Sequence, residues 1–441
     1  MKGLAAKNRM KVLLFPAALL LLLFLWVALR LSGVVDKSVD MLTNSGHRVT
    51  IHAGILAEES PVLEEMPLPE GLHSVSDGLQ REARLRALLS TMTLEEKVGQ
   101  LFFVGSNGGS MEEQVTKYHL GGVLLFTRDY RDASGDRWLT RDQFRSKLES
   151  LQAASVEDTG LPLFIGSDEE GGTVTRASRN PNLFDSRFRS PRQIWAQSGG
   201  SSDAFAEDAW EKSSALMELG VNVNFAPVCD VSTDPSDFIY DRSLGQDAAA
   251  TAEFVARTVT AMGEAGMRAV LKHFPGYGNN EDTHAGAATD RRSMETFESV
   301  DFVPFRAGIA AGKTLMPFVL VNHNTVQCMD ANMPASLSPA VHAVLRQKLG
   351  FEGVVLTDDL AMNAVKAYAA EGQAVVLALL AGNDMILTTD FRSQIQDVLD
   401  ALADGRLSED TINTACLRVL RAKEEQFHFL SADTNSDAAR P

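Results

Sequence analysis

The chain has 441 residues, of which 45% are hydrophobic and 22% charged, so as a whole it is neither disordered nor collagen-like. The 41 Lys and Arg residues stand against 58 Asp and Glu residues, and the resulting formal charge of −17 disfavours a nucleic-acid partner. This length suits one large α/β domain with extensions or two smaller domains.

Residues 1–30 are expected to form a signal anchor or transmembrane segment. Basic residues, the last of them Lys11, precede an apolar run from Val12 to Leu29 that only Pro16 interrupts. The run approaches the roughly 20 residues that cross a bilayer, and no clear A-x-A cleavage signal follows it. Because the basic residues come first, we expect one span in a bacterial inner membrane with the remaining chain on the periplasmic side. The alternative is secretion after signal cleavage.

Residues 31–80, rich in Glu and Pro, are expected to be a linker or stalk, with short strands around His47 to Leu56. A catalytic domain is expected over 81–428 and a flexible tail over 429–441. The three cysteines, Cys229, Cys328 and Cys416, have no metal-site spacing and are interpreted as small buried side chains.

Within 81–428, short apolar runs alternate with longer amphipathic segments, as in parallel strands joined by crossover helices. The expected strands are Leu101–Gly105, Gly122–Phe126, Leu163–Asp168, Val223–Asp230, Ala269–Phe274, Phe318–His323, Gly353–Asp359 and Asp384–Thr389. The expected helices include Arg141–Ser155, Ala204–Leu219, Ala248–Ala265, Pro339–Leu349 and Ala361–Ala381. Eight such units predict an α/β fold of the TIM-type (β/α)8 class, with irregular strand order or orientation allowed, although a doubly wound sheet would alternate similarly.

Polar residues fall at the C-terminal ends of five of these runs, where the active sites of barrel enzymes lie. They are Asp168, Asp230, the pair Lys272–His273, His323 and Asp358. One such residue alone would be interpreted as a helix cap. Their repetition on strands three to seven favours a barrel active site over the single switch point of an open sheet.

Three stretches resemble glycoside hydrolase family 3, and the resemblance extends from Met92 to about Lys423. MTLEEKVGQL at Met92–Leu101 resembles the start of that family's catalytic domain. KHFPGYG at Lys272–Gly278, followed by Asp282-Thr283-His284, is similar to its single-domain β-N-acetylglucosaminidase branch, and GVVLTDDLAM at Gly353–Met362 is similar to its nucleophile strand.

The resemblance implies a retaining β-N-acetylhexosaminidase that removes terminal β-linked N-acetylglucosamine from cell-wall or chitin-like glycans. Asp358 would be the nucleophile that forms a covalent glycosyl-enzyme. Because side chains alternate along a strand, we expect only one of Asp358 and Asp359 to face the barrel mouth, and Asp359 to cap or orient the next helix.

The general acid/base is assigned through the same resemblance. Many family members take this acid from a second domain, but this chain ends soon after the eighth unit, so the acid must come from a barrel loop or another subunit. The branch implies His284 as the acid/base and Asp282 as the residue that orients it, a pair able to give and take a proton near neutral pH. Tyr277 stands where the family commonly has His, and residues 279–281 form a shortened tether.

The resemblance also implies sugar-binding residues. The segment DEEGGTVTR contributes Asp168 and Arg176, although Thr173 stands where the family usually has Arg. The loop Asp241-Arg242-Ser243 contributes Arg242, and the end of the fifth run contributes Lys272 and His273. His323 is either another polar contact or a buried histidine bonded to the backbone.

Alternative functions remain at this stage. They are a β-glucosidase or β-xylosidase of the same family, phosphorolysis instead of hydrolysis, and a non-catalytic sugar-binding cell-wall module. Neither HExxH nor zinc-like cysteine spacing occurs, so we expect no metal and no cofactor. The expected partners are a glycan containing N-acetylglucosamine and, through residues 1–30, a membrane; the oligomeric state stays open.

Overall fold

The computed structural model describes residues 39–42, 48–51, 70–106, 110–280, 288–362, 365 and 373–432. The chain divides into two compact units, residues 1–70 and 71–441. In the first, β1 (Val39–Leu42) pairs antiparallel with β2 (Arg48–Ile51), inside the region where short strands were predicted. The predicted anchor lies outside the described residues, and no helix among those described is both long and apolar enough to cross a membrane.

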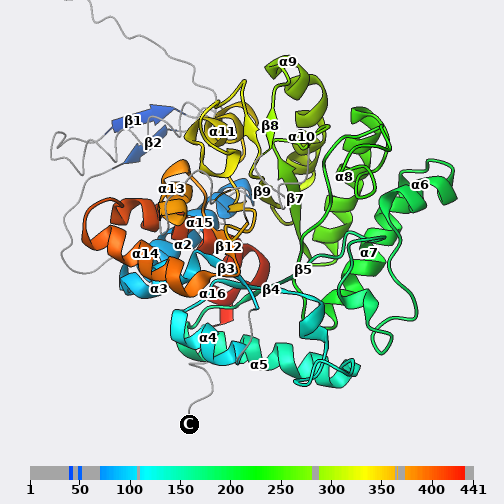
Figure 1. Cartoon of the computed structure of the whole chain (residues 1–441). Coiled ribbons are helices and arrows are strands. Elements are labelled where there is room, and N and C mark those ends of the chain that lie inside the picture. The colour runs from blue at the N-terminus through cyan, green and yellow to red at the C-terminus, as the bar shows by residue number, and fades with distance from the viewer. Residues whose placement is uncertain are drawn as a thin grey trace, which may run out of the picture. The chain divides into compact units, whose positions relative to one another are not determined.

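The second unit is built on an eight-stranded parallel sheet that curls into a nearly closed barrel (Figure 1). Its strands are β3 (Phe102–Gly105), β4 (Gly122–Leu125), β5 (Phe164–Ser167), β6 (Val223–Asn224), β7 (Arg268–Phe274), β9 (Phe318–Val321), β11 (Val355–Thr357) and β12 (Ile386–Thr388). They lie in the order β11-β9-β7-β6-β5-β4-β3-β12. A parallel bridge between Leu356 and Met385 joins the two outer strands. Each predicted run supplies one strand, and the TIM-type architecture is confirmed over the doubly wound sheet.

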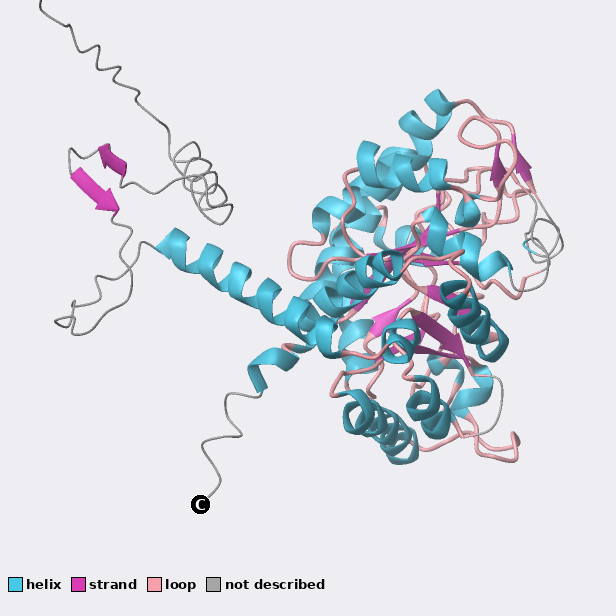
Figure 2. Ribbon diagram, turned by 90° about the vertical axis from the view of Figure 1, so that its left-hand side faces the viewer, coloured by secondary structure: helices cyan, strands magenta, loops and turns pink. Residues whose placement is uncertain are grey.

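Helices surround this sheet, as Figures 1 and 2 show. The longer ones are α2 (Glu70–Thr91), α3 (Leu94–Gln100), α4 (Met111–Tyr118), α5 (Arg141–Thr159), α6 (Pro191–Ser198), α7 (Asp203–Met217), α8 (Ala248–Glu264), α10 (Phe302–Ala311), α13 (Gln373–Ala381), α14 (Phe391–Ala403) and α15 (Glu409–Phe427). Short turns of helix are η1 (Thr127–Tyr130), η2 (Ala177–Arg179), α9 (Met294–Thr296), η3 (Phe297–Asp301), η4 (Ala335–Leu337), α11 (Pro339–Ala343), η5 (Val344–Lys348) and α16 (Phe429–Ala432). Helix α8 packs between α7 and α10.

The predicted helices agree with the structure where it describes them, apart from the first two residues of one segment. In the segment predicted as one helix from Ala361 to Ala381, Ala361 and Met362 form a turn and a bend, Val365 is helical, and α13 begins at Gln373; the other residues between Met362 and Gln373 lie outside the described ones. Helix α2 was not predicted, and it runs across the expected boundary between linker and catalytic domain at residue 80.

Local sequence explains where helices begin. The Thr93 hydroxyl accepts the backbone N–H of Glu96, and the Glu96 carboxylate accepts the N–H of Thr93 at 2.6 Å, so this pair forms a capping box that starts α3. Thr140 and Gln143 start α5 in the same way. Helix α5 ends at Gly160, whose φ of 71° requires a residue without a Cβ penalty.

The protein interior contains a buried lysine. Lys423 on α15 is fully buried, and its Nζ donates to Oε1 of Gln100 at 2.6 Å. Burial lowers the pKa of Lys423 to about 7, because the charged ammonium loses its hydration inside the protein. Cys229 and Cys416 are buried as predicted, but Cys328 is exposed. That part of the prediction was wrong because Cys328 lies in the turn that follows β10 (Thr325–Val326) rather than in a core element.

A small second sheet, which the sequence did not indicate, forms beyond the C-terminal ends of the barrel strands. In it β8 (Thr289–Asp290) pairs parallel with β10. Nδ2 of Asn280 donates to Oδ2 of Asp290 at 2.7 Å. This bond and the sheet fix Asn280 and Thr289 relative to one another. Residues 281–287, between Asn280 and Ala288, lie outside the described residues.

Candidate active site

A cavity of about 240 Å³ lies at the C-terminal ends of the barrel strands. It brings together the described residues that the sequence assigned to catalysis or sugar binding: Asp168, Arg176, Arg242, Lys272, His273 and Asp358. Apolar side chains complete the wall, namely Leu124, Phe126, Val174, Phe225, Leu320 and Leu387. The cavity therefore combines apolar walls with converging polar groups, which is typical of a small-ligand site.

Asp358 and Asp359 follow directly after β11 and have different surroundings. Oδ1 of Asp359 accepts the backbone N–H groups of Ala361 at 2.9 Å and Thr389 at 3.2 Å, and Oδ2 accepts the Thr389 hydroxyl at 3.3 Å. Burial raises the pKa of Asp359. Asp359 thus joins the ends of β11 and β12, in keeping with its predicted orienting role, although it also contributes to the cavity lining. Asp358 also lines the cavity, and its Oδ1 accepts the N–H of Asp359.

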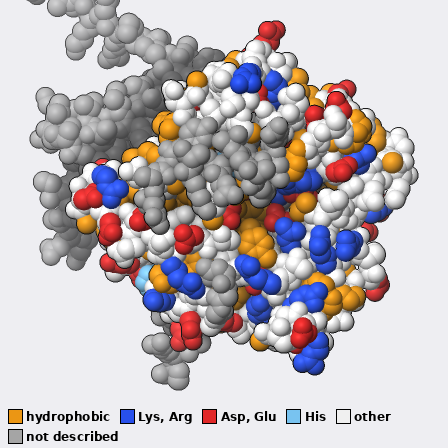
Figure 3. All heavy atoms as spheres, viewed as in Figure 1, with side chains coloured by type: hydrophobic (Ala, Val, Ile, Leu, Met, Phe, Trp, Pro, Cys, Tyr) orange, Lys and Arg blue, Asp and Glu red, His pale blue; other side chains and the backbone are white. Residues whose placement is uncertain are grey.

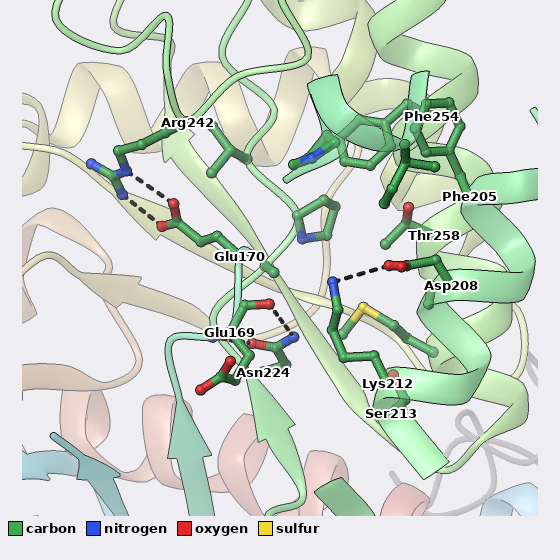
Figure 4. A pocket seen from close by; sticks show the side chains of 17 residues that line it. Glu169, Glu170, Phe205, Asp208, Lys212, Ser213, Asn224, Arg242, Phe254 and Thr258 are labelled. Carbon is green, nitrogen blue, oxygen red and sulfur yellow. Dashed lines mark hydrogen bonds and ion pairs between the residues drawn. The ribbon is translucent and has the colours of Figure 1, made fainter. Parts of the chain in front are cut away.

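Lys272 connects two carboxylates across the base of the cavity. Its Nζ lies 2.9 Å from Oδ1 of Asp168 and 2.6 Å from Oε1 of Glu170. Arg242 forms a two-pronged pair with Glu170, at 2.7 and 3.0 Å, which Figure 4 shows. Burial raises the pKa of Glu170, but Arg242 and Lys272 outweigh it and hold this pKa well below its usual range. Glu170 is therefore held in its ionised form by two cations.

His273 lies between Asp230 and Arg242. Its Nδ1 is 2.7 Å from Oδ2 of Asp230, and its Nε2 is 3.0 Å from Nη2 of Arg242. Because a guanidinium can only donate, Nε2 is the acceptor and Nδ1 carries the proton that is donated to Asp230. Asp230 also accepts the backbone N–H of Tyr277 at 2.7 Å. In this tautomer His273 orients Arg242 and ties it to the loop that follows β7.

Glu169 holds the turn that carries Arg176. The buried carboxylate of Glu169 accepts the backbone N–H of Arg176 at 2.5 Å, the N–H of Ala177, and the Ser178 hydroxyl at 3.0 Å. Asn224 on β6 in turn fixes the Glu169 backbone with two hydrogen bonds, one of which Figure 4 shows. Burial raises the pKa of Glu169 to about 7. The turn so held brings Nη2 of Arg176 to 3.4 Å from Oδ2 of Asp168.

Glu169 and Glu170 received no role from the sequence, and Asp230 was predicted only as a polar residue at a strand end. The run Asp168-Glu169-Glu170 was a signal, since three adjacent carboxylates at a buried strand end need cations or N–H donors. Which cation each one meets depends on residues from other strands, and the sequence did not show this.

His323 is a buried histidine bonded to its surroundings, the second of the two interpretations offered by the sequence. Its Nδ1 lies 2.7 Å from the Ser336 hydroxyl, and its Nε2 lies 3.1 Å from the backbone oxygen of Asp359. Since that oxygen can only accept, Nε2 donates to it. His323 therefore supports the segment that carries Asp358.

The predicted acid/base His284 and its partner Asp282 lie in the 281–287 loop, outside the described residues. Tyr277, at the start of that loop, is buried, lines the cavity, and packs edge-on against the ring of His273 with 5.3 Å between centroids. Across the described ranges, no cluster of three or more His, Cys, Asp or Glu residues could hold a metal ion.

Comparisons with known proteins identify the family of this chain. Residues 93–422 match the model of the glycosyl hydrolase family 3 N-terminal domain. A beta-hexosaminidase of Xylella fastidiosa is 35% identical over 68% of this chain and 83% of its own length. Beta-hexosaminidase LpqI of Mycobacterium tuberculosis is 32% identical over 77% of this chain and 84% of its own length.

Similar solved structures belong to the same family. A family 3 beta-N-acetylglucosaminidase from Paenibacillus has a TM-score of 0.68 and 32% identity, and the match covers 76% of this chain and 63% of that one. The structure of M. tuberculosis LpqI has a TM-score of 0.67 and 28% identity, covering 77% of this chain and 96% of that one. The resemblance found in the sequence is confirmed: this chain belongs to glycosyl hydrolase family 3.

Proposed function

We propose that this protein is a retaining β-N-acetylhexosaminidase that removes terminal β-linked N-acetylglucosamine from cell-wall or chitin-like glycans. The main support for the proposal is that one cavity of about 240 Å³ is lined by Asp358 together with Asp168, Arg176, Arg242 and Lys272. Relatives named as beta-hexosaminidases support the choice of sugar over the β-glucosidase or β-xylosidase alternative. The small cavity volume suits a single terminal sugar rather than a long glycan segment.

The proposed reaction is a double displacement. In the first step Asp358 attacks the anomeric carbon, the glycosidic bond breaks, and His284 gives its proton to the departing oxygen. In the second step His284 removes a proton from water, the water oxygen attacks the anomeric carbon, and the bond to Asp358 breaks. Asp282 would orient His284 and stabilise its cationic form.

Ion pairs hold the proposed sugar-binding side chains in the cavity. Lys272 and Arg242 pair with Asp168 and Glu170, and Arg176 lies 3.4 Å from Asp168. These contacts support a role for Asp168 and Arg176 in bonding to sugar hydroxyls.

We further propose an extracytoplasmic location, with residues 1–30 anchoring the chain in a bacterial inner membrane. The support is the basic residues before the apolar run from Val12 to Leu29. Protease treatment of intact spheroplasts would test it, because a periplasmic domain is degraded while a cytoplasmic one is protected.

The activity is tested by assaying the full-length protein on aryl N-acetyl-β-glucosaminide and on aryl β-glucoside. We expect a clear preference for the acetamido sugar and retention of the β configuration in the first product. Asp358→Ala should abolish turnover, and azide should partly restore turnover in His284→Ala. Equal turnover of both sugars would contradict the substrate assignment. Release of a sugar phosphate when inorganic phosphate is added would show phosphorolysis instead of hydrolysis.

A further inference from the structure

A cluster of charged side chains lies beside the two chain segments that flank residues 281–287. Arg292, between β8 and α9, contacts the carboxylates of Asp290 on β8 and Asp301 at the end of η3. Both carboxylates are almost completely buried, each with about 1% of its surface exposed. None of the three residues lines the active-site cavity. We call them the Arg292 cluster.

The guanidinium of Arg292 bonds to both carboxylates at once. Its Nε donates to the two oxygens of Asp290 at 3.0 and 3.1 Å, and its Nη2 donates to Oδ2 of Asp290 at 2.7 Å. Its Nη1 donates to Oδ2 of Asp301 at 2.8 Å. The guanidinium also lies over the ring of Phe297, 4.4 Å from its centroid. Two charged partners and an aromatic face hold the guanidinium in one place.

The same guanidinium contacts the segment that follows β7. Nη2 of Arg292 donates to the backbone oxygen of Gly276 at 3.3 Å. A Cβ at Gly278 would collide with the Arg292 guanidinium, and the φ of 55° at Gly278 also favours glycine. A Cβ at Gly276 would collide with the Asp301 carboxylate. The backbone before residue 281 therefore packs directly on the Arg292 cluster.

Asn280 ties the two flanks together. Its Nδ2 donates to Oδ2 of Asp290 and to the backbone oxygen of Tyr277, both at 2.7 Å. Asp290 belongs to the small sheet with β10, so a residue after 281–287 and a residue before it bond to one another. His284, the proposed acid/base, lies between these flanks in the sequence. The stretch that contains it therefore begins and ends at positions that the Arg292 cluster holds.

Charged pairs alone would not indicate a function. Lys and Arg side chains (blue) and Asp and Glu side chains (red) are interspersed over the face shown in Figure 3, and exposed pairs contribute little to stability. Asp290 and Asp301 differ because they are buried, and removing two carboxylates from water is costly. Apolar side chains would join the same segments at a lower cost. The forked guanidinium adds fixed direction, which apolar contacts lack.

We propose that Arg292 is a positioning residue for general acid catalysis. With Asp290 and Asp301, it sets the place from which His284 gives its proton to the glycosidic oxygen as the bond from that oxygen to the anomeric carbon breaks. The inference rests on the proposed function, in which His284 supplies this proton. Because Arg292 does not line the cavity, it acts on the rate through His284.

Leaving groups of different basicity separate this role from a merely structural one. A dinitrophenolate departs without a proton, whereas an unsubstituted phenolate needs one. The measured quantity is kcat/KM of the full-length protein for phenyl and for dinitrophenyl N-acetyl-β-glucosaminide, because it reports formation of the glycosyl-enzyme. We expect Arg292→Met to lower the phenyl value about ten- to a hundredfold and the dinitrophenyl value less than about threefold. A smaller folded fraction alone would lower both values equally.

A double-variant cycle tests whether Arg292 acts through His284. His284→Ala should lower the phenyl value more than Arg292→Met does, and it should also spare the dinitrophenyl value. Adding Arg292→Met to His284→Ala should cause no further loss, because the group that Arg292 positions is already absent. A further loss as large as in the single variant would overturn the inference.

Arg346→Met is the matched control. Arg346 is 19% exposed, against 20% for Arg292, and it likewise joins a buried carboxylate, that of Asp384, to backbone oxygens. Asp384 precedes β12, so this pair lies at the opposite end of the barrel from the cavity. Arg346→Met should therefore change the phenyl and dinitrophenyl values by the same factor.

Asn280→Ala is a second, milder variant, because it leaves the ion pairs of Arg292 in place. We expect a smaller loss than in Arg292→Met, again confined to the phenyl substrate. Equal losses on both substrates in Arg292→Met, or in Asn280→Ala if Arg292→Met does not fold, would overturn the inference. So would a selective loss of the same size in Arg346→Met. A wild type that cleaves neither substrate would instead reject the proposed function, so the two failures are distinguishable.

Discussion

The backbone N–H of Asp359 donates to Oδ1 of Asp358 at 2.9 Å. The Asp359 carboxylate is itself held by backbone groups on both sides of the strand ends. One aspartate therefore fixes the backbone that orients the other. Two adjacent, chemically identical residues thus make different contributions to the same site.

This relationship predicts different losses in two matched variants. Asp358→Asn should lower kcat by at least about a thousandfold, because the nucleophile is removed while its shape is kept. Asp359→Asn should lose far less, since an amide oxygen can still accept the N–H of Ala361. Steady-state kinetics on aryl N-acetyl-β-glucosaminide would check this. Losses of equal size would contradict the division of roles.

Lys272→Met should both destabilise the protein and weaken sugar binding. Removing the ammonium leaves Asp168 and Glu170 without one of their cations in a largely buried place, which typically costs about 3–5 kcal/mol of unfolding free energy. Urea unfolding and KM would be measured together. Lys272→Arg is the control, because it keeps the charge and should lose less stability. An unchanged urea midpoint for Lys272→Met would show that the pairs contribute nothing.

Glu169→Ala should affect sugar binding although Glu169 makes no expected contact with the sugar. Its loss leaves the buried N–H groups of Arg176 and Ala177 without acceptors, at about 1–3 kcal/mol each. We expect a lower unfolding free energy and a higher KM, because Arg176 loses its position. Glu169→Gln, which keeps one acceptor oxygen, should be milder in both measurements. A lower stability with unchanged KM would show that the turn does not position Arg176.

Lys423 should make stability depend on pH. Its folded-state pKa of about 7 is below the unfolded value, so between these values the unfolded chain binds more protons and stability rises with pH. The contribution is up to about 1.4 kcal/mol per pH unit from pH 7 towards 10.5, and it is constant below pH 7. Lys423→Met should remove this slope, as urea unfolding at pH 7, 8 and 9 would show. Parallel curves for both proteins would contradict the shift.

Sequence patterns were sufficient for the architecture because the barrel has a strong local signal. Its strands are buried on both faces, so each appears as a short apolar run. The helices between them are amphipathic, so their apolar residues recur every three or four positions. Where that signal is weak the prediction was silent. The two-residue strands β8 and β10 were not anticipated.

By itself the sequence determined the eight strands, the family and the position of Asp358 at a strand end, because each depends on local order along the chain. Only the tertiary structure decided that Glu170 pairs with Arg242 and Lys272 and that His273 orients Arg242. These pairings join residues from different strands and loops. Their energies depend on distance and burial in the folded protein, and linear spacing carries neither quantity.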